Sequence, residues 1–364
     1  MNRRAVLIAG GTAAVGAAAL GGFSLAEVGG MEAYDESVAA SRASLSAAPD
    51  LVALIGHATL AANSHNTQPW RFRIREARID ILPDFARRTP AVDPHDHHLF
   101  ISLGCAAENL VLAGASRGQQ ISARFSDEDG GLIACDVAAG AAVESELAAA
   151  IPFRQSTRAD YDGVALEAAV LGELAEAARE PGVELALVSA RSEIDRLRDL
   201  IAAANDRQMV DPAFLSELKS WIRFNSKQAL AQRDGLFSAC TGSPQLPGWI
   251  AGTMFDWFVT AEAESQRYRR QVDSSAGIAV FFAERDDPEH WTRVGRAFER
   301  FALKATALEI RTAHLNQPVE VAAFRGELAS LAGKPGGLPF LVVRFGRGPT
   351  MPYSIRRAVT DVLA

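Results

Sequence analysis

Residues 62–72 read ANSHNTQPWRF, and this stretch joins two kinds of secondary structure. Apolar residues at helical spacing over 51–58 end just before it, Pro69 fixes a turn within it, and the alternation that begins at Trp70 predicts a strand. A helix end, a turn rich in Asn, Ser, His and Gln, and a strand start place several donors and acceptors on one rim. Such loops carry ligands more often than cores do. A polar helix cap that leads into a hairpin explains the same pattern, so spacing alone leaves both interpretations open.

The composition bounds the class of protein. The chain has 364 residues, 48% of them hydrophobic, which is enough for two lobes or one large domain with a full core. A formal net charge of −7 argues against a nucleic acid partner, because phosphates require a basic surface. The three cysteines are widely spaced, and they predict neither a disulfide framework nor a zinc site.

The N-terminus has the features of a targeting segment. Arg3 and Arg4 precede an apolar stretch over 5–23, and Ser24-Leu25-Ala26 follows as a site of small residues. This order is typical of a secretory signal, and the arginine pair fits a twin-arginine address. We therefore expect residues 1–30 to export the protein, which would be periplasmic or membrane-anchored, with the membrane touched only through this segment. An uncleaved anchor is the alternative, because the apolar stretch is just long enough to span a bilayer.

The same segment imitates a dinucleotide-binding motif. VLIAGGTAAVG, residues 6–16, resembles a strand, a glycine turn and a helix start. However, Ala13 stands where the tighter variants of the motif have glycine, and no second apolar strand precedes an acidic residue at the required distance. We favour the leader, and a dinucleotide-dependent dehydrogenase remains a third, weaker interpretation of the chain.

The rest of the chain divides into a linker and two lobes. Residues 31–48 are small and polar without periodicity and predict a linker. Residues 49–150 form a first lobe, and residues 151–364 form a second, which contains an aromatic-rich and loop-rich insertion at about 211–270. Periodicity predicts strands over 72–75, 79–82, 121–125, 132–137, 183–188, 277–283 and 339–345, and helices over 97–117, 166–178, 192–204 and 288–311.

The two lobes share a motif. Gly104-x-Ala106-x-Glu108-x-x-x-Leu112 recurs as Gly295-x-Ala297-x-Glu299-x-x-x-Leu303, and each copy follows an Asp-Pro helix start. A glycine at the same point of both long helices indicates a close helix crossing, because glycine lets backbones approach. If the repeat is real, the chain is a duplicated domain whose copies pack as a pseudo-dimer; chance similarity of two amphipathic helices is the alternative.

Two further stretches carry clustered cations. FRQSTRADY, residues 153–161, places two arginines and a serine at alternate positions before a helix, a pattern that binds anions, although surface loops often carry two arginines as well. RFGRGPTMPYSIRRAV, residues 344–359, follows the last strand and ends in Arg356-Arg357, which is either a ligand-binding pair or a solvated basic tail.

Together these stretches resemble a known family. Asn66-x-Gln68-Pro69-Trp70 is similar to the Asn-x-Gln-Pro-Trp signature of the nitroreductase superfamily, and Arg154-x-Ser156-x-Arg158 is similar to its flavin-binding signature. The chain most resembles the large, two-lobed Acg-like branch with a twin-arginine leader. This resemblance implies an α+β, nitroreductase-like fold that binds flavin mononucleotide (FMN), duplicated so that one chain resembles a nitroreductase homodimer. The protein would be a monomer that acts as a pseudo-dimer, or a homodimer.

The resemblance also assigns site residues. Arg154 and Ser156 would hold the phosphate and ribityl end of FMN, and Arg158 would lie at the pyrimidine edge of the ring, where positive charge favours the reduced form. Arg356 would reach the phosphate, with Arg347 in reserve. The expected cofactor-binding residues are Ser64, Asn66, Gln68, Arg154, Gln155, Ser156, Arg158, Asn316 and Arg356. Asn316 belongs to HLNQP, residues 314–318, whose backbone N–H groups would face the ring, although His314 is as well explained as a helix cap. No second Asn-x-Gln-Pro-Trp copy is present, so we expect one intact site and one degenerate one.

The expected function is that of an oxidoreductase. Hydride from NAD(P)H or another donor would reach the flavin and pass to a nitroaromatic or quinone-like acceptor, with no side chain acting as a nucleophile. The aromatic insertion around 237–257 would act as a lid. The alternative is a protein that binds or sequesters flavin without turnover. The run DPHDHH, residues 93–98, resembles a metal-binding run only in composition, because its side chains fan out before a helix, and we expect no metal site there.

Overall fold

The computed structural model of the chain describes residues 27–43, 45 and 50–364. Most of the predicted leader and the whole of the dinucleotide-like stretch, residues 6–16, therefore lie outside the described residues.

The first lobe is an antiparallel sheet with a long helix. Its strands are β1 (Trp70–Arg75), β2 (Arg78–Pro83), β3 (Gln119–Ser126) and β4 (Leu132–Ala139), in the order β1-β2-β4-β3. The short helix α3 (Leu51–Ala58) precedes the sheet, and α4 (His97–Ser116) connects β2 to β3. The predicted hairpin, the two later strands and the long helix of this lobe are confirmed.

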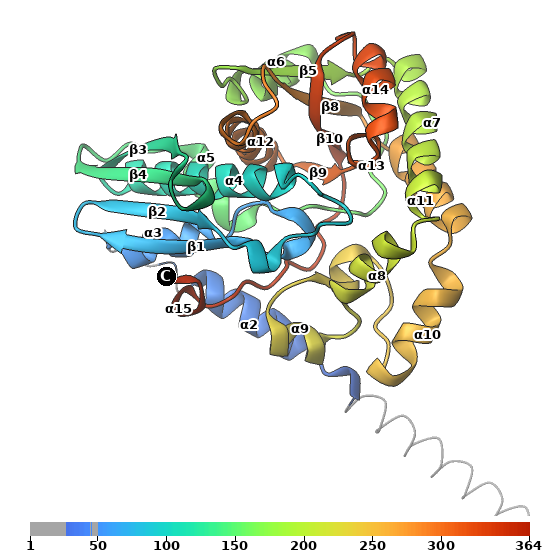
Figure 1. Ribbon diagram of the computed structural model, residues 1–364, viewed down its shortest axis with the longest axis horizontal. Coiled ribbons are helices and arrows are strands. Elements are labelled where there is room, and N and C mark those ends of the chain that lie inside the picture. Colours follow the sequence, from blue (N-terminus) through green and yellow to red (C-terminus); the bar gives the residue numbers. More distant parts are fainter. Residues whose placement is uncertain (1–26, 44, 46–49) are drawn as a thin grey trace, which may run out of the picture.

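The second lobe repeats this plan. Its strands are β5 (Val183–Val188), β8 (Gly277–Ala283), β9 (Ile310–His314) and β10 (Leu338–Arg347), in the order β5-β8-β10-β9, again all antiparallel. Helix α6 (Ala168–Ala177) precedes the sheet, and α12 (Pro288–Ala307) connects the second strand to the third. The order of strands is the same in both lobes, with the long helix at the same place, so the two-sheet layout fits a duplicated nitroreductase fold (Figure 1).

The end of the long second helix differs from its prediction. The helix was expected to reach Arg311, but α12 ends at Ala307 and β9 begins at Ile310. Glu309 has a φ of +58°, in the left-handed region, and this breaks the helix. The apolar alternation of β9 covers only five residues, which is too short to separate from the amphipathic pattern before it.

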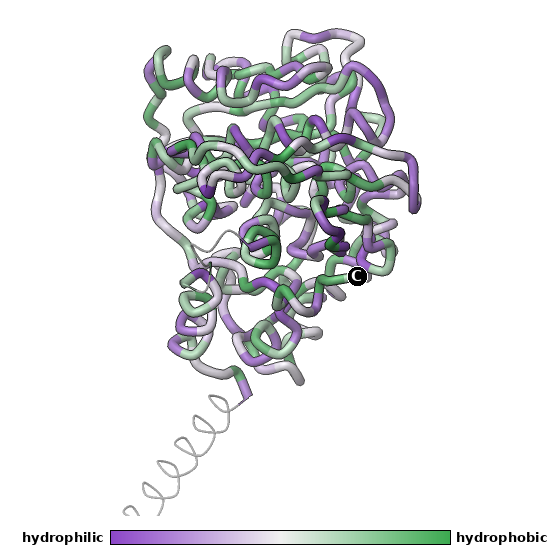
Figure 2. The backbone as a smooth tube through the Cα atoms, turned by 90° about the vertical axis from the view of Figure 1, so that its left-hand side faces the viewer, coloured by the Kyte–Doolittle hydropathy of each residue, from purple (hydrophilic) through white to green (hydrophobic). Residues whose placement is uncertain are grey.

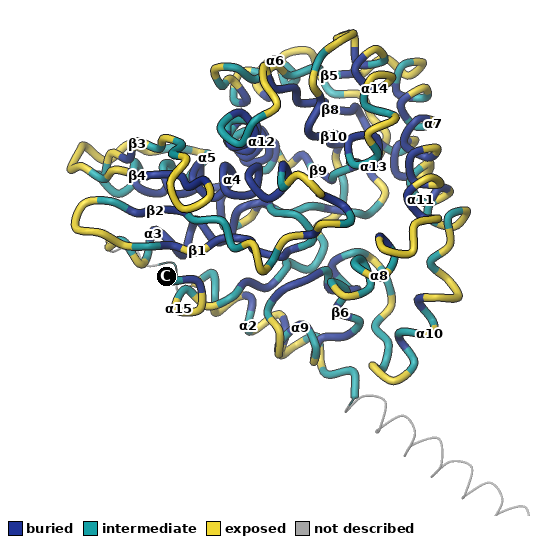
Figure 3. Tube along the Cα trace, in the orientation of Figure 1, coloured by how far each residue is buried: buried dark blue, intermediate teal, exposed yellow. Residues whose placement is uncertain are grey.

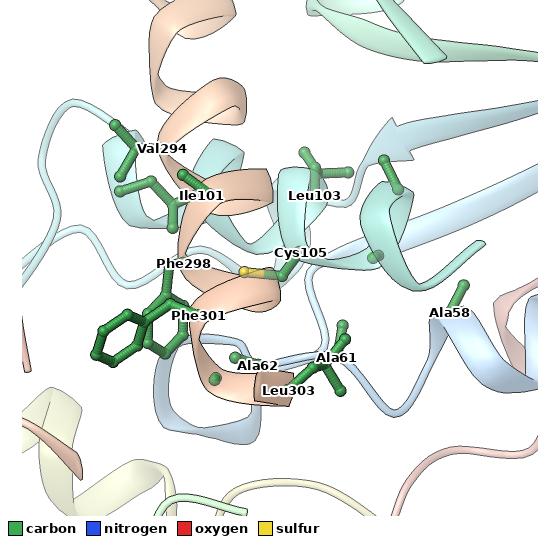
Figure 4. Packing of buried hydrophobic residues seen from close by; sticks show 14 of the residues in the cluster. Ala58, Ala61, Ala62, Ile101, Leu103, Cys105, Val294, Phe298, Phe301 and Leu303 are labelled. Atoms are coloured by element: carbon green, nitrogen blue, oxygen red, sulfur yellow. The ribbon is translucent and has the colours of Figure 1, made fainter. Parts of the chain in front are cut away.

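The two long helices cross at their shared glycine. An added Cβ on Gly104 would lie 2.0 Å from the carbonyl oxygen of Thr292, and one on Gly295 would lie 2.0 Å from that of Ile101. Figure 4 shows the packing around this crossing, where Ile101 and Cys105 of α4 lie near Val294 and Phe298 of α12. The predicted close crossing is confirmed, and it joins the long helices of the two lobes.

One apolar core runs through both lobes. Phe281 of β8 packs edge-on against Phe298 and Phe301 of α12, and Phe301 in turn contacts Phe345 of β10. Apolar segments gather inside the molecule (Figure 2), and α4 and α12 are buried (Figure 3). Among the described residues α4 alone is long and apolar enough to span a membrane, and its burial makes it a core helix.

The predicted linker is wrong over most of its length. Residues 31–43 form helix α2 (Met31–Ala43), which docks against α9 (Ser226–Gln232). Tyr34 and Val38, one helical turn apart, are buried in this contact, and the Tyr34 hydroxyl donates to the carbonyl oxygen of Tyr353 at 2.8 Å. Two apolar residues give no periodicity in the sequence, because tertiary packing supplies most of the stability of a short helix.

The segment that follows each sheet lies against the opposite lobe. The segment after β4 contains α5 (Glu146–Ala150) and continues to Ser156, which bridges to Thr312 of β9. The C-terminal segment contains α15 (Val359–Val362) and returns to β1, where Ala364 N–H donates to the carbonyl oxygen of Phe72 at 2.8 Å.

The insertion lies between β5 and β8 and is mainly helical, in contrast to the loop-rich region expected at 211–270. The capping side chains of Asp211, Asn225 and Thr260, which accept hydrogen bonds from the first turns, show how the sequence specifies three of its helices. Helix α7 (Arg191–Gln208), which the sequence predicted over 192–204, precedes the insertion. The elements of the insertion are α8 (Pro212–Ser220), β6 (Ile222–Arg223), α9, β7 (Leu236–Phe237), α10 (Gly248–Phe258) and α11 (Ala261–Asp273). Two further short helices, α13 (Gln317–Glu320) and α14 (Arg325–Leu331), follow β9.

Candidate functional site

A cavity of about 640 Å³ lies where the two lobes and the insertion meet. Its wall includes four segments: the loop over 62–66, the Arg-Ser-Arg segment over 154–158, the start of α13 and the C-terminal segment over 352–356. Of the nine residues expected to bind a cofactor, eight line this cavity: Ser64, Asn66, Arg154, Gln155, Ser156, Arg158, Asn316 and Arg356. Motifs that lie far apart in the sequence therefore meet at one place.

The loop over 62–68, here called the Asn-rich loop, has a strained backbone. His65, Asn66 and Gln68 have φ values of +46°, +53° and +53°, in the left-handed region that residues other than glycine rarely adopt. The Asn63 side chain accepts from Gln68 N–H at 2.9 Å and closes the turn. Three such residues within four positions are typical of a functional loop that its surroundings hold in place.

Gln68 does not line the cavity, in contrast to its expected role. Its side chain is fully buried, its Nε2 donates to the Arg233 carbonyl at 2.8 Å, and its Oε1 accepts from Arg357 N–H at 2.8 Å. Gln68 thus joins the Asn-rich loop to the insertion and to the C-terminal segment. The motif marks the residue correctly as important, but the hydrogen bonds define a positioning role.

Arg356 also donates its hydrogen bonds to groups of the protein itself. Its guanidinium donates to the Thr59 carbonyl and to Asn66 Oδ1, each at 2.8 Å, so it fixes both the end of α3 and the loop. Burial, together with Arg154 and Arg42, lowers its pKa to about 9. Arg347, the reserve candidate, is exposed at the end of β10 and does not line the cavity.

Arg154 forms a buried ion pair. Its Nε lies 3.0 Å from Glu299 Oε1, with both side chains almost fully buried, and its Nη2 donates to the Leu60 carbonyl at 2.9 Å. Glu299 in turn accepts from Ala62 N–H at 3.2 Å. Burial raises the pKa of Glu299, and the Arg154 guanidinium opposes that shift. The pair therefore anchors the first residues of the Asn-rich loop to α12.

Several cavity groups remain open to a ligand. Within residues 50–364, the hydroxyls of Ser64 and Ser156 and the guanidinium of Arg158 have no hydrogen-bond partner. The Gln155 side chain, by contrast, is engaged with the backbone of Met351, donating at 3.1 Å and accepting at 2.8 Å. The Asn316 Oδ1 accepts from Val342 N–H at 2.9 Å, which leaves its amide N–H groups for the cavity.

The wall contains ionisable groups beyond those we expected. Burial lowers the pKa of His65 to about 4 and that of His98 to about 3, so both imidazoles are neutral at pH 7. His314 is lowered likewise, to a pKa of about 3, by burial and by Arg158. Glu320 accepts from Gln208 Nε2 at 2.7 Å, and its burial raises its pKa to about 7. Glu320 is the last residue of α13 and belongs to no motif, so nothing in the sequence marks it.

The raised pKa of Glu320 predicts a pH-dependent stability. Between pH 4.5 and about 7 the folded state keeps a proton that the unfolded state has released, so the free energy of unfolding falls as the pH rises through this window. Glu320→Gln removes this dependence and makes the chain more stable than the wild type at pH 8, by up to about 3 kcal/mol. Urea denaturation at pH 5 and pH 8 measures the difference. Glu327→Gln, on the exposed side of α14, is the control, and equal pH profiles for wild type and Glu320→Gln would contradict the prediction.

The position related to the cavity by the internal repeat is filled. Arg296 stands at the repeat position of Cys105, which lines the cavity, and it donates to Glu108 at 2.9 Å. Arg300 reaches the same carboxylate at 2.8 Å, and both arginines also contact Glu180, in the turn before β5. Charged side chains therefore stand in the second copy of the repeat, where the first copy has Cys105 at the cavity wall.

The DPHDHH run has its own internal partners. Asp93 Oδ1 lies 2.7 Å from His97 Nδ1, and its Oδ2 accepts from Leu99 N–H in the first turn of α4. His97 Nε2 lies 2.9 Å from an Arg325 nitrogen. In the part of the chain that the structure describes, no three His, Cys, Asp or Glu side chains are arranged to hold a metal ion.

Comparisons with known proteins point to one family. No family model matches the chain. It is 29% identical over 318 residues to a Mycobacterium tuberculosis H37Rv protein named "Putative NAD(P)H nitroreductase Rv3131", with 84% of this chain and 88% of that protein covered. A protein of M. tuberculosis CDC 1551 / Oshkosh, "Putative NAD(P)H nitroreductase MT3217", gives the same values. This similarity supports the nitroreductase superfamily.

Solved nitroreductase structures are also similar to this chain. A nitroreductase with bound FMN from Bacteroides fragilis is 18% identical, with a TM-score of 0.36, and the match covers 57% of this chain and 90% of that one. A nitroreductase with bound FMN from Desulfitobacterium hafniense is 16% identical, with a TM-score of 0.39 and coverages of 61% and 98%.

Proposed function

We propose that the protein is an FMN-dependent oxidoreductase of nitroreductase type. The observation that carries this proposal is the convergence of the Asn-Gln-Pro-Trp loop and the Arg-Ser-Arg segment, residues 154–158, on one cavity. The name of the M. tuberculosis relatives, NAD(P)H nitroreductase, agrees with it. Hydride would come from NAD(P)H or another donor, and the acceptor would be a nitroaromatic or a quinone.

The residues of the cavity fit FMN. Its volume of about 640 Å³ lies within the range of roughly 300–1,000 Å³ that is usual for ligand pockets. Five arginines face it against two glutamates, Glu264 and Glu320, which suits a ligand that carries a phosphate. The Ser156 hydroxyl and the Arg158 guanidinium have no hydrogen-bond partner among the described residues, so these two residues are best placed to hold FMN. Bound FMN would supply the hydride chemistry.

The protein's own groups orient the ligand and exclude water. Arg154 and Arg356, whose donors hold the end of α3 and the Asn-rich loop, would add positive charge at the phosphate end. Arg158 would place a cation where negative charge develops on reduction. Phe224, Phe237 and Phe255 of the insertion line the cavity and would keep water from it, as expected of a lid.

The first experiment is an absorbance spectrum of the purified full chain, recorded before and after anaerobic addition of NADPH. A spectrum of oxidised flavin that bleaches with NADPH supports the reductase. A yellow protein that keeps its colour with NADPH and with other biological electron donors favours a flavin-binding or sequestering protein. A colourless chain that also fails to bind added FMN contradicts both.

Substitution of Arg158 tests the site directly. Arg158→Met removes the cation without breaking a hydrogen bond to the described residues, so the free energy of unfolding stays close to wild type. The Kd for FMN rises by about tenfold or more, because a charge-assisted contact is lost. Fluorescence titration with FMN measures it. Arg347→Met removes an exposed cation outside the cavity and leaves the Kd unchanged; equal Kd values for both variants would exclude Arg158 from the site.

Export belongs to the proposal as well. The arginine pair and apolar run over 3–23 support a twin-arginine address, with the protein periplasmic or membrane-anchored. A cavity whose wall comes from both lobes of one chain supports a monomer that acts as a pseudo-dimer.

A further inference from the structure

Helix α10 carries a strongly exposed aromatic face. Trp249 and Trp257 are 72% and 69% exposed, and Phe258 is 64% exposed. Trp249, Thr253 and Trp257 are four residues apart along the helix and therefore share one stripe. Each tryptophan carries about 200 Å² of surface, most of it exposed, so the two of them together with Phe258 reach the few hundred Å² at which an apolar patch often marks an interaction site. Figure 3 shows α10 at the edge of the molecule, with much of its surface exposed.

The opposite face of α10 belongs to the cavity. Met254 and Phe255 line the wall, and Phe255 is buried against Phe224. Among the lining residues that the structure describes, Pro244 and Phe258 are the exposed ones. Pro244 lies four residues before α10, and Phe258 is the last residue of α10. The cavity therefore opens beside this helix, and the exposed tryptophans lie next to its mouth.

The N-terminal segment enters the fold on the same side. The Val28 carbonyl accepts from the Ser226 hydroxyl at 3.0 Å, at the start of α9. Two residues further along α9, Gln228 Nε2 lies 3.1 Å from the position of a Cβ on Gly248, the first residue of α10. The apolar run of the sequence ends at Phe23, five residues before Val28, and five extended residues reach at most about 18 Å. A membrane that held this run would lie close to α10.

We propose that α10 docks on the surface of a lipid bilayer through Trp249 and Trp257, so that the cavity opens toward the membrane. Tryptophans on one face of a short apolar helix are typical of helices that lie in the membrane interface. The one charge among the exposed residues of α10, Asp256, is paired with Lys219 at 2.7 Å, which lowers the cost of bringing it near lipid. Polar headgroups would then surround the mouth, and the apolar wall would continue into the acyl region.

A membrane-facing mouth specifies the class of acceptor, a point that rests on the proposed function. The acceptor would be an apolar quinone dissolved in the bilayer. Its reduction to the quinol consumes one hydride, from NAD(P)H or another hydride donor, and one proton from water. A water-soluble nitroaromatic would reach the same cavity from solution without using α10.

Tryptophan fluorescence of the full chain tests the docking. The chain is mixed with phosphatidylcholine vesicles, and with matched vesicles of brominated phosphatidylcholine, which quench only fluorophores that contact the acyl region. The residues before Glu27 contain no tryptophan, so insertion of the leader alone gives no quenching. We expect the brominated lipid to quench the wild type, and the quenched fraction to fall in Trp249→Phe and in Trp257→Phe. Trp221, at the C-terminal end of α8, is half-buried. Trp221→Phe is therefore the matched control and keeps the quenching.

Each other outcome overturns the proposal. A vesicle-bound chain whose tryptophans are not quenched shows that α10 faces water, and a chain that does not bind vesicles excludes a membrane partner. A dimer seen by light scattering that dissociates in Trp249→Ser/Trp257→Ser shows that a second copy covers this face instead.

The acceptor is tested by rates. Trp249→Ser/Trp257→Ser should lower the rate with a long-chain quinone in vesicles by about tenfold or more, and leave the rate with a water-soluble quinone within about twofold. Equal losses with both quinones overturn the acceptor assignment. Flavin absorbance of the same samples separates the two proposals. Quenching in a chain without flavin supports the docking and contradicts the reductase. Flavin reduction without quenching supports the reductase and contradicts the docking.

Discussion

Gly104→Ala is expected to lower the free energy of unfolding by more than about 3 kcal/mol. The new methyl carbon would lie 2.0 Å from the Thr292 carbonyl oxygen, a backbone atom of α12 that cannot move without shifting the helix. The two helices would separate at the contact that joins the lobes, and core residues such as Phe298 and Phe301 would lose packing on both sides. Urea denaturation of the full chain, followed by circular dichroism, measures the loss.

Gly295→Ala makes the reciprocal test, because its Cβ would meet the Ile101 carbonyl oxygen at the same distance. Gly172→Ala is the matched control: Gly172 is exposed within α6 and has no atom within 4 Å of an added Cβ. That substitution should stabilise the chain by about 0.5–1 kcal/mol, because alanine loses less backbone entropy in a helix. If Gly104→Ala unfolds at the same urea concentration as Gly172→Ala, the crossing does not join the lobes.

The repeated glycine illustrates what the sequence can predict. Two long helices with a glycine at the same place follow from periodicity, and a close crossing follows from the absence of a side chain. The sequence does not say which atoms approach. In the structure each glycine meets the other copy of the repeat, which makes the motif a single contact between lobes. Strands flanked by turns were likewise predictable, because apolar alternation, as in β1, and a continuous apolar run between turns, as in β8, are both local signals.

The parts that escaped prediction depend on distant contacts. Helix α2 buries Tyr34 and Val38 and partly buries Met31, and their partners are in the insertion and the C-terminal segment. Strand β9 is specified by its pairing with β10 more than by its own five residues. The site shows the same division: eight of the nine residues that the motifs predicted line the cavity, but the ion pair of Arg154 and the hydrogen bonds of Gln68 and Arg356 could not be read from spacing.

Breaking the Arg154–Glu299 pair should have an unequal effect that depends on which partner is removed. Glu299→Leu leaves a buried guanidinium that cannot lose its charge, so we expect a loss of about 3–5 kcal/mol. Arg154→Met leaves a carboxyl group whose pKa burial already raises, and this group can take up a proton. Its cost is smaller at low pH and grows as the pH rises. Urea denaturation at pH 5 and pH 8 separates the two variants.

The control for this comparison is an exposed pair. Arg124 and Asp136 lie 3.4 Å apart on neighbouring strands, with both side chains at least half exposed. Arg124→Met should change the free energy of unfolding by less than about 1 kcal/mol at either pH, because solvent screens such pairs. A similar small effect for Glu299→Leu would show that the buried pair contributes nothing that water does not replace.

The double variant Arg154→Met/Glu299→Leu separates the structural role of Arg154 from its proposed role toward FMN. Two apolar side chains of similar length replace both charges at once, so much of the stability lost in Glu299→Leu should return. If Arg154 only anchors the loop, the refolded double variant binds FMN as the wild type does. If it also contributes charge to the phosphate, the Kd for FMN stays at least about tenfold weaker although the fold is restored. Because a destabilised loop and a missing cation both weaken binding in the single variants, only the stable double variant distinguishes them, and a wild-type Kd there would remove Arg154 from the ligand site.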